Sequence, residues 1–211
     1  MTDYLTGRAG AREDFCRYLA ACYYEPSNDF AEERLFDSMV AAASAIDPAI
    51  VDSARRLGEA FAGADLQELL VDYTRLFIGP SQPMAMPYAS FWLTADQSQR
   101  HEATMAVLDF YEEGGFEVSD EFRELPDHVA IELEFLYLLI FTENQAREEG
   151  AAEELAGSAA LRRRFVGEHL AAWVDQFTAA VNSGAGTAFY RELADLTRRF
   201  IRMEADLDRL N

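Results

Sequence analysis

Apolar residues recur every three or four positions along most of this chain, which is the spacing of one face of an α-helix. The most regular stripe begins at Leu66 and reaches Phe77, where Gly79 and Pro80 end it. Further helices are predicted over residues 11–24, 28–45, 47–61, 94–113, 126–148, 160–182 and 187–210. No stretch alternates apolar and polar residues as a half-buried strand does. We therefore predict an all-α fold, a single globular bundle of about eight helices that spans residues 1–211.

The segment from Glu124 to Phe141 is apolar on nearly every face, so we expect the other helices to surround it. It is too short to span a bilayer, and two glutamates interrupt it. Pro126 suits a first helical turn, and Asp127 places a carboxylate where the free N–H groups of a helix start need an acceptor. His128 and Glu132 are four residues apart and share a face. Three ionisable side chains are thus predicted at the start of the central helix.

Two linkers separate the predicted helices. Residues 79–93 contain three prolines and are predicted to pack as an extended segment. Their Met84, Met86, Tyr88 and Trp92 are too apolar for an ordinary solvent-exposed loop, so they either seal the core or form a peptide-binding groove. Residues 114–125 form a polar hinge through which C-terminal helices could exchange between copies, and both a monomer and a domain-swapped homodimer stay open. Residues 150–158 are read as loop or frayed helix.

The charge of the chain is unusual, since 38 acidic residues against 18 basic ones give a net charge of −20, and every basic residue is an arginine. Such a surface is typical of a protein that stays solvated in a salty, halophile-like cytoplasm; a GC-rich genome combined with an acidic partner-binding surface is the alternative. The negative field argues against nucleic acid and membrane surfaces as partners. Arg162–Arg164 is the one basic cluster, and we expect it to be a solvated helix face.

Catalytic and metal-binding arrangements are not apparent. Ser90, Asp127 and His128 lack the spacing of a hydrolase triad, and no nucleophile elbow surrounds the serine. The three histidines are scattered, and a P-loop would need a lysine that the chain does not have. We therefore predict a protein that is not an enzyme and has no metal or cofactor. A helical metal- or nucleotide-dependent enzyme and a structural subunit of a larger complex remain alternatives.

The cysteines and the N-terminus indicate where the protein works. Cys16 and Cys22 lie six residues apart on one predicted helix and do not share a face, so they are predicted to be small buried apolar residues without a disulfide. The first residues contain no apolar stretch of a secretory signal, and no run reaches transmembrane length. A cytoplasmic protein is expected.

Three short motifs occur in a recognisable order. They are Tyr73, Leu76, Phe77 and Gly79 (Y-x-x-L-F-x-G), then Pro87, Tyr88 and Ser90 (P-Y-x-S), then Glu124, Pro126, Asp127 and His128 (E-x-P-D-H) followed by Glu132 and Phe135. Together with Trp173 and Phe189–Tyr190, they make most of the chain resemble the TorD/DmsD family of cytoplasmic redox-enzyme maturation chaperones. The resemblance implies an all-helical chaperone.

The same resemblance implies a partner and a site. The partner would be the catalytic subunit of a molybdenum-dependent oxidoreductase, held by its twin-arginine leader peptide and its body until its cofactor is inserted and it is exported. The neighbouring nitrate-reductase branch, whose enzyme need not be exported, stays an alternative. The family's leader-binding surface would fall on Tyr73, Leu76, Phe77, Pro87, Tyr88, Trp92, Asp127 and His128. This chain has Tyr73 and Tyr88 where some members of the family have tryptophan, a difference that bears on leader specificity.

Overall fold

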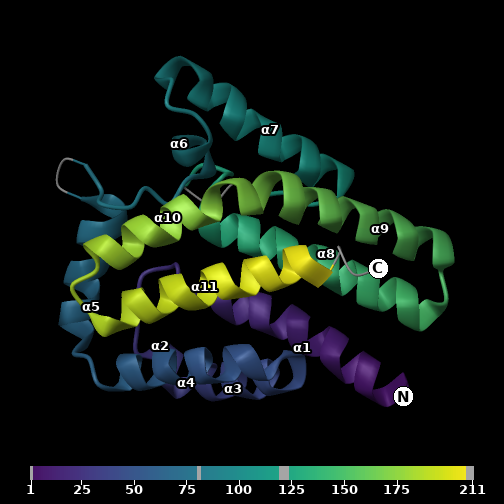
Figure 1. Cartoon of the computed structure of the whole chain (residues 1–211), viewed down its shortest axis with the longest axis horizontal. Helices are drawn as coiled ribbons and strands as arrows, with labels where there is room; N and C mark the ends of the chain where they lie inside the picture. Colours follow the sequence, from purple (N-terminus) through teal and green to yellow (C-terminus); the bar gives the residue numbers. More distant parts are fainter. Residues whose placement is uncertain (1, 80–81, 119–123, 208–211) are drawn as a thin grey trace.

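Helices form the regular structure of residues 2–79, 82–118 and 124–207, which are the residues described by this computed structural model (Figure 1). In chain order the elements are α1 (Thr2–Ala21), α2 (Asp29–Glu32), α3 (Leu35–Ile46), α4 (Pro48–Ala62), α5 (Leu66–Tyr73), the π-helical η1 (Thr74–Ile78), α6 (Ala89–Leu93), the 3-10 turn η2 (Gln97–Gln99), α7 (Arg100–Glu113), α8 (Val129–Glu149), α9 (Ala152–Arg164), the π-helical η3 (Phe165–Leu170), α10 (Ala171–Gly184) and α11 (Ala188–Leu207). Because the η segments continue their neighbours, about eight long helices result. The predicted all-α fold is confirmed.

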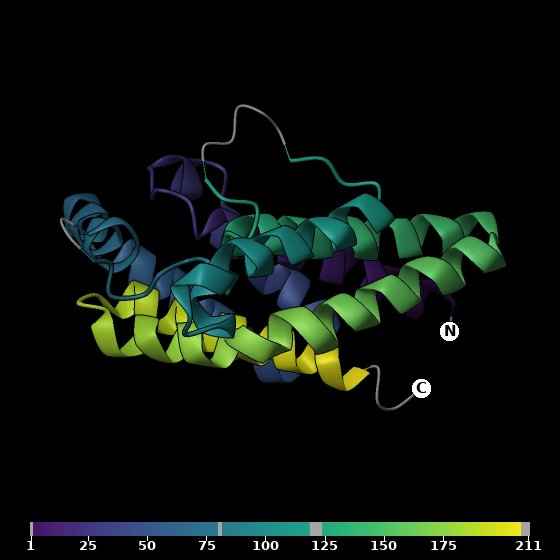
Figure 2. The same ribbon diagram turned by 90° about the horizontal axis from the view of Figure 1, so that it is seen from above.

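The long helices lie in layers (Figure 1). Helices α3 and α4 pair at one side, α1 packs on α3 and α8, and α11 packs on α4 and α10. Figure 2 shows that α9, η3 and α10 run on as one helix, against which α8 lies on one part and α6 on another. The short α6 and the longer α7 pack together outside these layers.

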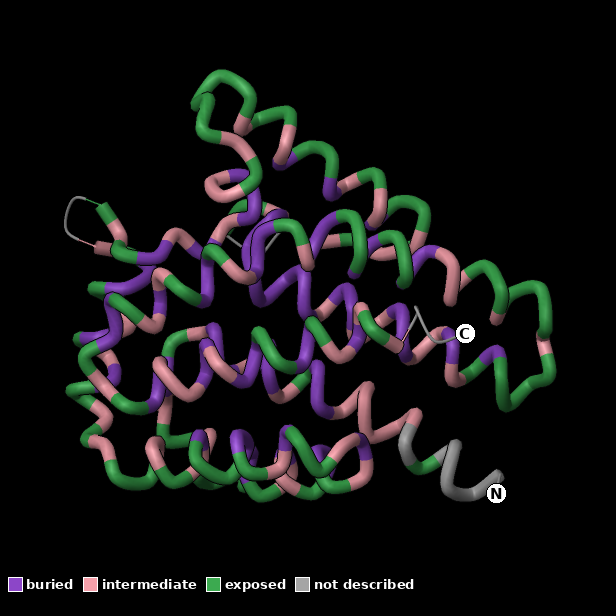
Figure 3. Tube along the Cα trace, in the orientation of Figure 1, coloured by how far each residue is buried: buried purple, intermediate pink, exposed green. Residues whose placement is uncertain are grey.

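A single apolar core connects these layers. Its buried members come from the N-terminal helix α1, the central helix α8 and the C-terminal helices α10 and α11 alike, and Trp173 and Phe135 are among the largest fully buried side chains. Cys16 and Cys22 belong to this core as free thiols, as predicted. Figure 3 shows the buried positions gathered on the middle helices, while α7 is mostly exposed or intermediate.

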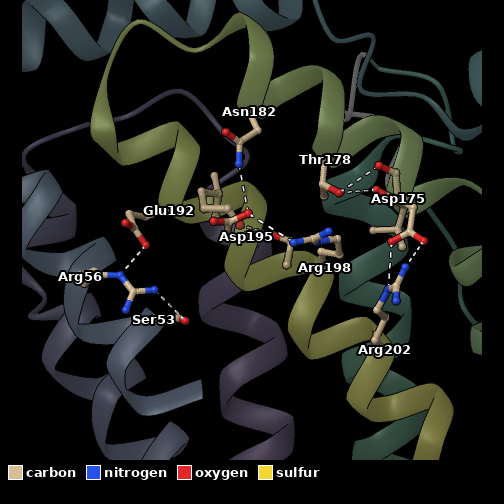
Figure 4. A network of polar contacts seen from close by, with 12 residues as sticks. Ser53, Arg56, Asp175, Thr178, Asn182, Glu192, Asp195, Arg198 and Arg202 are labelled. Atoms are coloured by element: carbon tan, nitrogen blue, oxygen red, sulfur yellow. Dashed lines mark hydrogen bonds and ion pairs between the residues drawn. The ribbon is translucent and has the colours of Figure 1, made fainter. Parts of the chain in front are cut away.

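Exposed and partly buried polar contacts tie α10 and α11 to each other and to α4 (Figure 4). Arg202 donates to Asp175 across the two helices, and Asn182 donates to Asp195 at 3.0 Å. Arg56 on α4 reaches Glu192 on α11 at 2.9 Å. Since exposed ion pairs each contribute about 0–1 kcal/mol, these contacts fix the alignment of the helices more than they stabilise the fold.

Several predicted helix boundaries were wrong. Helix α1 already begins at Thr2, and residues 28–45 are two helices, because Arg34 takes a left-handed conformation (φ 55°) between α2 and α3. The α9 helix starts at Ala152, inside the stretch read as loop or frayed helix. The helix predicted over 94–113 begins later: Asp96 caps the short η2 by accepting from the Ser98 N–H, and α7 starts at Arg100. Parts of the predicted 114–125 hinge and of the last helix lie outside the described residues.

Arg162 corrects the expectation of a solvated basic face. It is 5% exposed, and its Nε donates to Glu143 on α8 at 2.5 Å. Its Nη1 lies 3.6 Å from Glu204 on α11, which also pairs with Arg12 on α1. We call these four residues the buried charge network. Arg163 and Arg164 are exposed, as expected, so only one of the three arginines turns inward, where two buried carboxylates offset its desolvation.

Candidate functional site

A cavity of about 320 Å³ opens where η1, the segment before α6 and the start of α8 meet. We call it the Tyr73 cavity. Its lining residues are Tyr73, Phe77, Ile78, Pro83, Met86, Pro87, Tyr88, Glu124 and His128. Five of them belong to the surface that the family resemblance implied, although they come from three separate stretches of sequence. The cavity therefore exists only because tertiary packing joins these stretches.

Backbone hydrogen bonds hold the three stretches together. Residues Tyr88 and His128 form an isolated antiparallel β-bridge, and the Val129 N–H donates to the Pro87 carbonyl at 2.8 Å. The Ala85 N–H donates to the carbonyl of Leu76 at 2.9 Å. Gly79 turns the chain back with φ +63°, and a Cβ there would lie 2.8 Å from the Pro83 nitrogen, so this turn requires glycine. The walls of the cavity are thus fixed by main-chain contacts.

Tyr88 links the aromatic wall to a carboxylate. Its hydroxyl donates to Glu124, and its ring meets the His128 ring edge-on at 5.5 Å between centroids. Burial and the Glu124 carboxylate both raise the pKa of Tyr88, so the phenol stays protonated at neutral pH and keeps donating. Glu124 is exposed on its free side and gives the cavity an acidic rim.

His128 is a structural cap at this site. It is the N-cap of α8, and its Nδ1 accepts from the Ala130 N–H at 3.2 Å, which leaves the proton of the neutral ring on Nε2. Burial lowers the pKa of His128 to about 4, against the raising effects of Glu124 and Asp127. The imidazole is therefore neutral at pH 7 and presents no positive charge to a ligand.

Tyr73 forms the opposite wall at the end of α5. Its ring is half-buried, packs edge-on against Phe77 at 5.4 Å, and has its pKa raised to about 12 by burial and by Glu124 and Glu25. The neighbouring Asp72 accepts from the Gly186 and Thr187 N–H groups at 2.8–3.0 Å, which ties the end of α5 to the turn between α10 and α11. The backbone next to Tyr73 is therefore fixed to that turn by hydrogen bonds.

Three of the predicted site residues do not line the cavity. Leu76 is fully buried in the core behind it. Trp92 is not in the lining; its Nε1 donates to the Met86 carbonyl at 2.8 Å and its ring lies against Phe91 and Phe177. Asp127 is 0% exposed, so the acidic group available to a cation at this cavity is Glu124 and not Asp127.

Asp127 instead starts a helix that the sequence did not predict. Its Oδ2 accepts from the Ser90 N–H at 2.8 Å, and its carbonyl accepts from the Ala89 N–H at 2.9 Å. These are the first residues of α6, so residues 89–93 are helical where an extended segment was predicted. The helix start is satisfied by a residue 37 positions further along the chain, which local sequence patterns do not reveal. Consequently α8 begins at Val129, with His128 as its cap.

A buried polar group behind the site was also missed. Glu132 turns into the core, where its carboxylate pairs with the His169 ring nitrogen at 2.7 Å and accepts from Trp173 Nε1 at 3.1 Å. Burial raises the pKa of Glu132, while the Glu132 carboxylate outweighs burial at His169 and raises the pKa of that ring. The sequence did offer one signal for this pair: Glu132 and His169 are each a polar residue on an otherwise apolar helix face, and each needs a buried polar partner.

Within residues 2–79, 82–118 and 124–207, no group of three His, Cys, Asp or Glu side chains is placed to hold a metal ion. None of the helices in that part of the chain is both long and apolar enough to cross a membrane.

Comparison with known proteins identifies the family. The family model described as nitrate reductase delta subunit matches residues 43–179. The chaperone protein TorD of Aliivibrio salmonicida (strain LFI1238) is 27% identical over 191 residues, which cover 90% of this chain and 87% of the relative. The perchlorate reductase assembly chaperone protein of Dechloromonas aromatica (strain RCB) is 30% identical over 133 residues, which cover 62% of this chain and 58% of the relative.

A solved structure has the same fold. The crystal structure of a proposed redox enzyme maturation protein from Archaeoglobus fulgidus superposes with a TM-score of 0.55 at 19% identity, over 90% of this chain and 93% of that one. At that identity the likeness concerns the fold. The family model covers more than half of the sequence, and a relative named as a TorD chaperone aligns over 90% of the chain. The chain therefore belongs to the nitrate reductase delta subunit family, the TorD family of redox-enzyme maturation chaperones.

Proposed function

We propose that this protein is a cytoplasmic chaperone that binds the twin-arginine leader and the body of a molybdenum-dependent oxidoreductase and assists cofactor insertion before export. It acts by binding and not by catalysis. The observation that carries the proposal is the Tyr73 cavity, in which two half-buried tyrosines face an exposed glutamate. TorD and the perchlorate reductase assembly chaperone are relatives whose names describe chaperones, which supports the same class of function.

The cavity suits a peptide that combines arginines with an apolar helix. The rings of Tyr73 and Tyr88 offer flat apolar area, and Glu124 offers a carboxylate to a guanidinium. Further exposed apolar surface comes from Ile78 in the cavity lining and from Met84 outside it, which are 56% and 51% exposed. A leader helix would lay its apolar face on these side chains while one arginine reaches Glu124.

Salt changes the balance between these contacts. In a salty cytoplasm the Debye length falls towards about 3 Å, so long-range attraction between the acidic surface and a cationic leader is screened. Burial of apolar surface, at roughly 25 cal/mol per Å², is then the larger source of affinity. We expect aromatic substitutions to weaken leader binding at all salt concentrations, and Glu124→Gln to weaken it chiefly at low salt.

The experiment is a titration of a synthetic twin-arginine leader peptide by calorimetry or fluorescence anisotropy. Tyr73→Ala should weaken binding about tenfold or more, as expected for an aromatic anchor at a peptide interface. Tyr137→Ala removes another half-buried tyrosine, on α8 outside the cavity, and should leave the affinity unchanged. Phe77→Ala is a poor probe, because Phe77 is 6% exposed and packs in the core. Equal losses for Tyr73→Ala and Tyr137→Ala would contradict the assignment of the cavity.

A second candidate is an assembly chaperone for a nitrate-reductase-type enzyme that is not exported. The description of the matching family, nitrate reductase delta subunit, favours it. Native pull-downs with two forms of the client, with and without its leader, separate the two candidates. Capture that needs the leader supports the first function, whereas equal capture of both forms supports the second.

A further inference from the structure

A second cavity of about 390 Å³ adjoins the Tyr73 cavity. We call it the Arg100 cavity; its lining residues are Met86, Tyr88, Ser90, Phe91, Arg100, His101, Thr104 and Leu125. Met86 and Tyr88 line both cavities and form their shared wall. The two cavities are therefore immediate neighbours on the protein.

The two cavities differ in charge. The Tyr73 cavity has the carboxylate of Glu124, whereas the Arg100 cavity contains an arginine and a histidine and, among the described residues, no carboxylate. Asp127, which holds the N–H of Ser90, is fully buried and does not line the cavity. A basic cavity on a protein of net charge −20 is a local reversal of the overall field.

Arg100 lacks the partner that most arginines of this protein have. In the described part of the chain, carboxylates pair with Arg12, Arg17, Arg34, Arg55, Arg56, Arg75, Arg162, Arg164, Arg198 and Arg202. Arg100 forms no such pair there; its guanidinium lies over the Phe91 ring, 4.6 Å from the centroid. Its Nε is buried and has no hydrogen-bond partner among the described residues. A buried, unsatisfied donor costs free energy that an acceptor would recover.

The position of Arg100 adds to this cost. Arg100 and His101 are the first two residues of α7, where the helix dipole favours anions and disfavours cations. The nearby Asp96 is already engaged, since it accepts from the N–H and the hydroxyl of Ser98. An anion in the cavity would therefore satisfy the guanidinium and complement the helix start together.

We propose that the Arg100 cavity binds the carboxylate of an aspartate or glutamate in the same client segment that occupies the Tyr73 cavity. This rests on the proposed function and adds a requirement to it: the bound segment carries an acidic residue beside its arginines and apolar residues. A guanidinium can form two parallel hydrogen bonds with a carboxylate. Met86, Phe91 and Leu125 provide apolar walls for the methylene groups of the acidic side chain.

A glutamate scan tests this. A twin-arginine leader peptide is synthesised with one glutamate, or one glutamine, at successive positions on either side of the arginines, and each dissociation constant is measured at low salt. At one position, glutamate should bind the wild-type protein about fivefold more tightly than glutamine, as expected for a charge-assisted hydrogen bond that is partly exposed. Arg100→Gln should abolish this preference, and Arg100→Glu should reverse it.

The control is Arg163→Gln, which removes the same charge from an exposed arginine on α9 and should keep the preference. If the arginine-containing peptides bind but no position prefers glutamate, the inference fails and the proposed function stands. If no peptide of the set binds, the proposed function itself is contradicted, and with it the inference that rests on it. If millimolar inorganic phosphate abolishes the tighter binding of the glutamate peptide over the glutamine peptide, the cavity is a site for free anions and the inference is overturned.

Discussion

Replacing Arg162 by methionine tests the buried charge network of Arg12, Glu143, Arg162 and Glu204. The substitution removes a guanidinium that lies 2.5 Å from Glu143 and 3.6 Å from Glu204, two residues that are 3% and 0% exposed. At an effective dielectric constant of about 20, one such contact corresponds to roughly 4 kcal/mol. Breaking a buried pair by removing one partner costs about 3–5 kcal/mol, because the remaining charge is left uncompensated.

For a chain of this size, a loss of about 3–5 kcal/mol lowers Tm by about 6–20 °C. Calorimetry and urea unfolding measure the change, and urea leaves the ionic strength free to vary. Arg163→Met is the matched control: it removes an exposed neighbouring arginine and should stay within about 0.5 kcal/mol of wild type. Adding Glu143→Gln to Arg162→Met should recover part of the loss. Equal stability of Arg162→Met and Arg163→Met would refute the reasoning.

Three further substitutions address single groups. His128→Asn keeps a capping side chain for α8 but removes the group that titrates. Burial holds the pKa of His128 near 4 in the fold, against 6.5 in the unfolded chain. As the pH falls from 6.5 to 4, the free energy of unfolding of the wild type, measured in urea, should therefore drop by up to about 3 kcal/mol more than that of the variant. Burial alone would raise the pKa of Asp72, but the N–H groups that donate to its carboxylate lower it. The stability that Asp72 contributes should therefore be present above pH 3.8 and be lost below it. Asp72→Asn should cost about 1–3 kcal/mol at pH 7 and should lack this dependence on acid. His169→Leu leaves Glu132 buried without its ring partner and should destabilise the protein by about 3 kcal/mol or more in thermal melts, whereas His101→Leu, an exposed histidine, should change little. A neutral result for His169→Leu would mean that Glu132 is protonated in the fold.

The candidate site was predicted in part because its residues carry local signals. Proline and glycine mark the turns on either side of the Tyr73 cavity, and an aromatic, methionine-containing segment between prolines is unusual enough to single out Met86 and Tyr88. The roles within the site were harder to predict. Asp127 looked available to a ligand and is buried, whereas Glu124 was recognised only as part of a motif and lines the cavity.

Periodicity determined the helical class and most helix positions, because a buried stripe must repeat every three to four residues whatever lies against it. Composition determined the acidic surface. The tertiary structure alone decided which N–H the Asp127 carboxylate accepts from, which of Arg162 to Arg164 turns inward, and that Glu132 meets His169. Each of these depends on a partner between 19 and 37 residues away along the chain, and the free energy of a buried polar group depends on that partner and not on its neighbours in sequence.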